Sequence, residues 1–108
     1  MPTESLRAAR EAIVREHMAS EERGDFAATV RTFHRPRYEV MPTLESHDGE
    51  TAVRTLLEET GAAFPGFHFS ETTLHQADSA IIVETTFVGR HEGTWRGLPR
   101  PERTSHTR

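Results

Sequence analysis

Apolar residues recur at three- and four-residue spacing along the first part of the chain, and this pattern predicts an amphipathic helix over residues 3–23. Thr3 is placed to cap its start, and Gly24 to end it. His17 lies beside the apolar stripe, so we expect a buried, hydrogen-bonded histidine there rather than a catalytic one.

Two further helices are predicted before the middle of the chain is passed. A short helix over 26–33 is capped by Asp25, and Pro36 closes it. A strand is predicted at 37–41, and a polar loop then leads to a third helix that ends before Pro65. Asp48 is the expected cap of that third helix.

Beyond Gly66 the apolar period changes from helical to alternating. Strands are predicted at 67–75 and 80–90, joined by a turn at 76–79. In the second of these strands Ile81, Val83, Thr85 and Phe87 share one face. Helices followed by consecutive strands predict an α+β fold, with helices on one face of a mainly antiparallel sheet.

Composition narrows the class of protein. The 108 residues suit a single domain over 1–108, and the absence of cysteine excludes disulfides and thiolate chemistry. A formal net charge of −4, with every basic residue an arginine, disfavours nucleic-acid binding. No segment is apolar enough for a membrane span or a secretion signal, so we expect a cytoplasmic protein without a membrane partner.

Two residues are candidates for chemistry. Glu39 lies in the strand at 37–41, where a carboxylate facing an apolar cavity could act as a general base; the alternative is that it faces water or pairs with an arginine. His91 continues the alternation of Thr85 and Phe87 and is expected at the mouth of a cavity. Histidine spacing gives no metal-ligand pattern, and nucleophile and phosphate-loop motifs are absent, so proton transfer or plain binding is left.

Several stretches together resemble the SnoaL-like polyketide cyclase branch of the nuclear transport factor 2-like superfamily. They are SEERGDFAATVRTF, HDGETAVRTLLEETGAAFPGFHF, ADSAIIVETTFVGRHEG and WRGLPRPERTS. The resemblance implies a cone-shaped α+β domain of the cystatin-like kind, whose curved sheet packs against three helices in the N-terminal half around an apolar pocket. It also implies a homodimer and no need for a cofactor or metal.

By this resemblance we expect a pocket lined by Tyr38, Val83, Thr85, Phe87, Trp95 and Leu98, with His91 and Glu39 as its polar groups. The implied function is that of a pocket protein for a hydrophobic small molecule. In the catalytic version it is a cyclase or isomerase that removes a proton next to a carbonyl. The alternatives are a non-catalytic binding or dimerisation domain, or a shortened inactive member, because the last strands of the family fold would follow the end of this chain.

Overall fold

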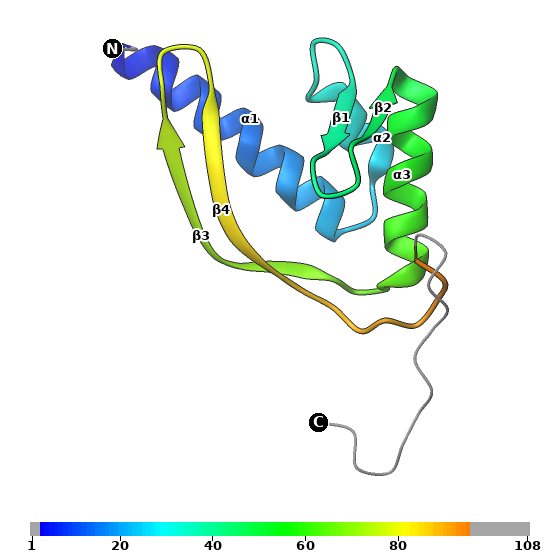
Figure 1. Cartoon of the computed structure of the whole chain (residues 1–108). Helices are drawn as coiled ribbons and strands as arrows, with labels where there is room; N and C mark the ends of the chain where they lie inside the picture. The colour runs from blue at the N-terminus through cyan, green and yellow to red at the C-terminus, as the bar shows by residue number, and fades with distance from the viewer. Residues whose placement is uncertain (1–2, 96–108) are drawn as a thin grey trace.

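Three helices and four strands follow one another along residues 3–95, the part of the chain that the computed structural model describes (Figure 1). In chain order they are α1 (Glu4–Glu22), α2 (Phe26–Arg31), β1 (Arg37–Val40), β2 (Glu45–Asp48), α3 (Glu50–Ala63), β3 (His68–Gln76) and β4 (Ile81–Val88). The α+β class with three helices, expected from the sequence, is confirmed.

The ends of α1 and the start of α2 are set by the residues that the sequence indicated. The Thr3 hydroxyl accepts a hydrogen bond from the backbone N–H of Leu6 at 3.1 Å, which satisfies one of the free donors of the first turn. Gly24 follows the last turn with φ 74°, a conformation that costs glycine nothing. The Asp25 carboxylate then accepts from the N–H of Ala28 at 3.2 Å and begins α2.

The packed core lies where α2 meets α3. Val30, Val53 and Leu57 are each less than a tenth exposed, and Phe26, Phe33 and Tyr38 pack against them. Val30 comes from α2, whereas Val53 and Leu57 lie one turn apart on α3. This small core holds the two helices together and fixes the position of β1 through Tyr38.

A strand that the sequence did not predict pairs with β1. β2 lies in the segment expected to be a polar loop, and its residues pair antiparallel with β1 from Arg37 opposite Asp48 to Val40 opposite Glu45. Asp48 therefore ends a strand instead of capping α3, so that expectation was wrong. Gly49 occupies the cap position of α3 with φ 95°, and its N–H donates to the carbonyl of Pro36 at 2.9 Å.

β3 and β4 form a long antiparallel ribbon with an irregularity in its middle. Ser70 is opposite Thr86 and Thr73 is opposite Glu84, so β3 has one residue more than β4 between these pairs. Glu71, within this bulge, has φ 55°. The predicted turn is closed by a hydrogen bond from the N–H of Ala77 to the carbonyl of Ala80 at 2.9 Å.

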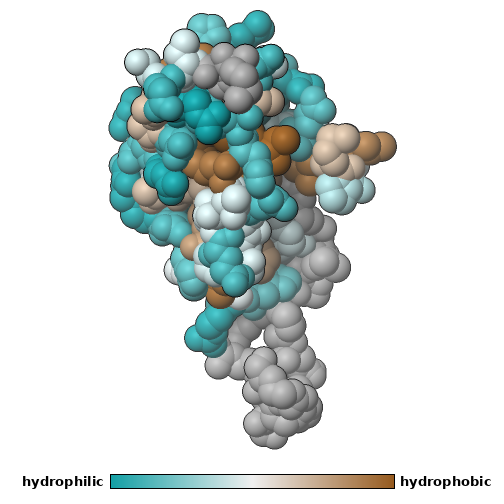
Figure 2. All heavy atoms as spheres, turned by 90° about the vertical axis from the view of Figure 1, so that its left-hand side faces the viewer, coloured by the Kyte–Doolittle hydropathy of each residue, from teal (hydrophilic) through white to brown (hydrophobic). Residues whose placement is uncertain are grey.

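Among residues 3–95 the strands form two separate pairs, β1 with β2 and β3 with β4. Figure 1 shows the β3–β4 ribbon running beside α1 at its turn and bending toward the C-terminal end of α3. Seen from the side of this ribbon, the surface is mainly hydrophilic, with apolar patches between the polar side chains (Figure 2). Ile82 and Val88 of β4 are 58% and 39% exposed.

Within the described residues, none of the three helices has the length and hydropathy that crossing a membrane requires.

Candidate functional site

Two of the helices, α1 and α3, and three of the strands, β1, β3 and β4, line one large apolar cavity. Its volume is about 630 Å³, within the range usual for small-molecule sites. The cavity is lined by Ile13, Val14, His17, Met18, Glu21, Thr32, Phe33, Tyr38, Val40, Leu56, Leu57, Thr60, Phe67, Phe69, Val83, Thr85, Phe87 and Trp95. The third helix, α2, reaches the cavity only through the two residues that follow it, Thr32 and Phe33.

The cavity is open on one side within the described part of the chain. Its lining residues Ile13, Val83 and Phe87 remain 52%, 37% and 42% exposed. Ile13 lies on α1 and the other two on β4, so the opening lies between these elements. A ligand can reach the cavity there without displacing the packed core around Val53.

Five of the six residues expected to line a pocket are in this wall. Tyr38 enters it from β1, and Val83, Thr85 and Phe87 enter it from β4 on the face that their alternation indicated. Trp95 lies at the end of the described chain and packs on Phe64, with ring centroids 5.4 Å apart. Leu98, the sixth, lies outside the described residues.

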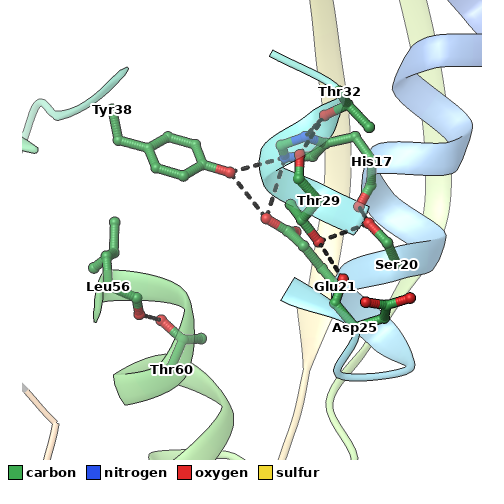
Figure 3. Close-up of polar contacts among 9 residues, drawn as sticks. All are labelled: His17, Ser20, Glu21, Asp25, Thr29, Thr32, Tyr38, Leu56 and Thr60. Carbon is green, nitrogen blue, oxygen red and sulfur yellow. Dashed lines mark hydrogen bonds and ion pairs between the residues drawn. The ribbon is translucent and has the colours of Figure 1, made fainter. Parts of the chain in front are cut away.

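One wall of the cavity carries a cluster of three polar side chains (Figure 3). The Tyr38 hydroxyl donates to Glu21 Oε2 at 2.9 Å and lies 2.8 Å from His17 Nε2. Nε2 is also 3.2 Å from the same carboxylate oxygen. His17 and Glu21 are one turn apart on α1, and their side chains are only 21% and 12% exposed.

A second row of hydrogen bonds holds the His17 ring in place. Its Nδ1 lies 2.8 Å from Thr32 Oγ1, and Thr32 donates to the carbonyl of Thr29 at 2.6 Å. Behind it, the fully buried hydroxyls of Ser20 and Thr29 are 2.6 Å apart and join α1 to α2. Ser20 also donates to the backbone carbonyl of His17, whereas the ring itself is oriented by the contacts of Nδ1 with Thr32 and of Nε2 with Tyr38.

The environment of Tyr38 keeps its hydroxyl protonated. Burial raises the pKa of Tyr38 far above the usual value for tyrosine, and the negative charge and hydrogen bond of Glu21 raise this pKa further. The hydroxyl therefore keeps its proton, and can donate a hydrogen bond, over the whole physiological range.

The structure does not bring Glu39 to the cavity. Its side chain is 52% exposed and pairs with Arg37, which lies two residues earlier on the same outward face of β1. Because side chains alternate along a strand, Tyr38 points inward from β1 and Glu39 points away. Glu84 is likewise exposed, at 71%, and lies against His75. Glu21 is the carboxylate among the described lining residues.

His91 lies beside the cavity wall without being one of its lining residues. Its ring is 5.1 Å from that of Phe64, and its Nε2 is buried with no hydrogen-bond partner among residues 3–95. The chain around it is held by α3, since the N–H groups of Glu92 and Gly93 both donate to the carbonyl of Ala63. Gly93 suits this close approach, because a Cβ there would lie 3.1 Å from the carbonyl oxygen of Ala62, a tight contact.

Comparison with protein families decides what kind of domain this is. The sequence model of the SnoaL-like polyketide cyclases matches residues 11–106. The chain belongs to this SnoaL-like family. Membership implies the nuclear transport factor 2-like fold, in agreement with the α+β arrangement of helices and strands. No curated protein and no solved structure matches the chain. The homodimer expected from the sequence stays a prediction.

The polar side chains in the cavity wall of this SnoaL-like domain are of the kinds that proton transfer needs. The described cavity wall contains a carboxylate, an imidazole and a phenol in mutual hydrogen-bond range, surrounded by apolar side chains. No group of three or more histidine, aspartate or glutamate side chains within residues 3–95 is arranged to hold a metal ion.

Sequence reasoning missed Glu21, although a signal for it was present. Glu21 continues the apolar stripe of α1, three residues after Met18 and four after His17. A carboxylate on the buried side of an amphipathic helix, one turn from a histidine, marks a polar site inside the fold. His17 was expected to be a buried, hydrogen-bonded residue rather than a catalytic one. The structure confirms its hydrogen bonds, but the side chain is half-buried and lies in the cavity wall.

Proposed function

We propose that this SnoaL-like protein binds a hydrophobic, carbonyl-bearing small molecule and moves a proton at the carbon next to its carbonyl, without a cofactor. One observation carries the proposal. Glu21 is the carboxylate of a cavity wall that is otherwise apolar apart from His17, Tyr38 and three threonines, among the described residues. This composition suits a ligand that is mostly hydrocarbon with a single oxygen-bearing end.

Glu21 is placed to act as the base in this reaction. Its Oε2 is engaged by Tyr38 and His17, whereas its Oε1 has no hydrogen-bond partner among residues 3–95. A carboxylate held by one oxygen keeps a fixed orientation and presents the other to the ligand. The surrounding aromatic and aliphatic walls hold the reacting carbon in place and limit the access of water.

The test measures proton exchange at carbon. Hydrophobic ketones of cavity size are incubated with the protein in deuterated water, and loss of the proton next to the carbonyl is followed by NMR. Glu21→Gln should lower the exchange rate by about a hundred- to ten-thousand-fold, the usual contribution of a general base. Glu11→Gln makes the same change on an outward position of α1, where Glu11 pairs with Arg15, and should leave the rate unchanged.

Binding is measured separately from turnover through Trp95. Trp95 is the single tryptophan of the chain and lines the cavity, so a bound ketone should change its fluorescence. Ketones that change the fluorescence but do not exchange would indicate a binding domain without catalysis, the alternative function. Exchange that is equal in the wild type and in Glu21→Gln would overturn the assignment of the base.

A further inference from the structure

The polar cluster in the cavity wall fixes how many protons it holds. Three heteroatoms, Tyr38 Oη, Glu21 Oε2 and His17 Nε2, form a triangle with sides of 2.9, 2.8 and 3.2 Å. The two short sides both end at the Tyr38 hydroxyl. Each of these two short sides needs a proton of its own, since two lone pairs facing each other would repel, and one Tyr38 proton shared by both acceptors would lie off the line of each contact.

Thr32 determines what the other ring nitrogen of His17 does. Thr32 Oγ1 lies 2.6 Å from the carbonyl oxygen of Thr29, which can only accept, so the Thr32 proton is used there. Thr32 Oγ1 must then accept from His17 Nδ1 across the remaining 2.8 Å contact. One ring proton of His17 is thereby assigned to Nδ1, and the neutral form of the ring would have none left for Nε2.

The triangle therefore needs one proton that neutral His17 and ionised Glu21 do not supply. Tyr38 contributes a single proton, which occupies the side toward Glu21. The side between Tyr38 and His17 is filled only if His17 Nε2 is also protonated, or if Glu21 carries the proton and Tyr38 turns toward Nε2. In both arrangements His17 and Glu21 together hold one proton besides the Nδ1 proton of His17, and the pair has no net charge. That is the favourable charge for a partly buried pair.

We propose that His17 and Glu21 share this one proton and that, with Tyr38, they form a site that acts as acid and base in the same step. This rests on the proposed function. The step starts from the arrangement with the shared proton on His17 and Glu21 ionised. Glu21 takes the proton as the ligand's C–H bond breaks; that electron pair forms the carbon–carbon double bond of the enol, and the π pair of the carbonyl moves to its oxygen. Tyr38 gives its proton to this oxygen and receives the proton of His17 Nε2 in the same step, so that no tyrosinate is left. The pair ends with one proton, as it began, and the ligand has become its enol.

Glu21 and Tyr38 are the catalytic residues of this step, and His17 is a positioning residue that resupplies Tyr38. The number of protons held by the cluster also indicates the ligand class. The Tyr38 hydroxyl can donate a hydrogen bond to the ligand's oxygen. The site therefore favours a ligand with a carbonyl or enolate oxygen, which accepts a hydrogen bond, over a ligand whose polar group only donates one.

The proton count is tested in the free protein, without any ligand. Protein labelled with ¹⁵N in histidine and ¹³C in glutamate shows the protonation of the His17 ring and of the Glu21 carboxyl near neutral pH. The expected result is either a doubly protonated ring beside a carboxylate or a neutral ring beside a carboxylic acid. A neutral ring beside an ionised Glu21 carboxyl would overturn the proposal. In Glu21→Gln the His17 signals should shift, whereas Glu11→Gln should leave them unchanged.

The acid role is tested with Tyr38→Phe, which removes only the hydroxyl. Exchange of the ketone proton should fall by about a hundred- to a thousand-fold, the usual loss for a donor that stabilises a developing oxyanion. Thr55→Val removes a hydroxyl from an exposed position of α3 and should leave exchange unchanged. Circular dichroism and Trp95 fluorescence establish that both variants are folded.

The outcomes separate the two proposals. Equal exchange in Tyr38→Phe and wild type would overturn the acid role while the base at Glu21 stands. A wild type that exchanges none of the ketones would contradict the proposed function and the acid step together. The labelling result would still decide whether His17 and Glu21 share a proton.

Discussion

Tyr38, on the first strand, places its hydroxyl 2.9 Å from the carboxylate of Glu21, on the first helix, 17 residues earlier in the chain. This contact crosses the cavity wall and joins β1 to α1 through their polar side chains (Figure 3). The packing of Tyr38 on Phe33, with centroids 5.4 Å apart, holds the ring from its other side. The predictions below follow from this contact and from the elements that support it.

Tyr38 should resist ionisation at high pH. It is the single tyrosine of the chain, so the ultraviolet absorbance of tyrosinate reports on it alone. Burial and Glu21 raise its pKa, and no tyrosinate should form at about pH 10, where free tyrosine titrates, while the protein is folded. A tyrosinate signal with an ordinary midpoint in the folded protein would contradict this.

The same raised pKa predicts how stability depends on pH. The unfolded chain loses the tyrosine proton above about pH 10, whereas the folded protein keeps it. The contribution of Tyr38 is therefore fully present below that pH and is lost as the pH rises toward the folded-state pKa. Urea unfolding at several alkaline pH values measures this, and Tyr38→Phe should remove the dependence that belongs to this residue.

The buried contact between Ser20 and Thr29 should contribute measurably to stability. Thr29→Val keeps the shape of the side chain but removes the hydroxyl that lies 2.6 Å from Ser20 Oγ. The free energy of unfolding should fall by about 1 kcal/mol, the usual net value of such a hydrogen bond. Thr55→Val, the same change at an exposed helical position, should alter it by no more than about 0.5 kcal/mol.

The core between α2 and α3 should be sensitive to loss of volume. Leu57 is 5% exposed and packs with Val30 and Val53, so Leu57→Ala should lower the free energy of unfolding by about 2–5 kcal/mol. Leu44→Ala is the matched control because Leu44 is 82% exposed, and its effect should stay within about 0.5 kcal/mol. Chemical denaturation compares the two, and equal losses would place the core elsewhere.

Arg10 should hold the turn of the β3–β4 ribbon against α1. Its guanidinium donates to the carbonyl of Ala77 at 2.8 Å and to the carbonyl of Asp78, while Gln76 donates to the carbonyl of Arg7 at 2.9 Å. Arg10→Ala should therefore speed amide hydrogen exchange in residues 76–80, where the local structure opens more often. Arg15→Ala removes an exposed arginine of the same helix and should leave this exchange unchanged.

The helix caps were predictable from sequence because they depend on neighbouring residues alone. Thr3, Gly24 and Asp25 each act within one turn of their own position, and the structure confirms all three. β2 was missed for the opposite reason. Its four residues include none of the valine, isoleucine, threonine, tyrosine, phenylalanine or tryptophan side chains that favour strands, and pairing with β1 gives them their extended form.

The candidate site was predictable only in part. Alternation along β4 indicated which residues share the face of the cavity, but a strand of four residues such as β1 gives no internal reason to choose between Tyr38 and Glu39 as the inward residue. The choice is made by the tertiary contacts of Tyr38 with His17 and Glu21. The meeting of α1 with β1 has no signature in either segment alone.

The extra residue of β3 determines which side chains face the helices in the half of the β3–β4 ribbon that lies between the bulge and the turn. Phe69, before it, and Leu74, after it, are both half-buried, although an uninterrupted strand would turn positions of opposite parity to opposite sides. Shortening the chain by one residue at 71–72 would thus exchange Leu74 with the exposed His75 and invert the ribbon as far as its turn. A change of chain length at 77–80 would disturb the contacts of the turn with Arg10 but leave each strand residue on its own face, whereas a change at 71–72 would move a whole run of side chains to the opposite face. The latter should therefore cost more stability.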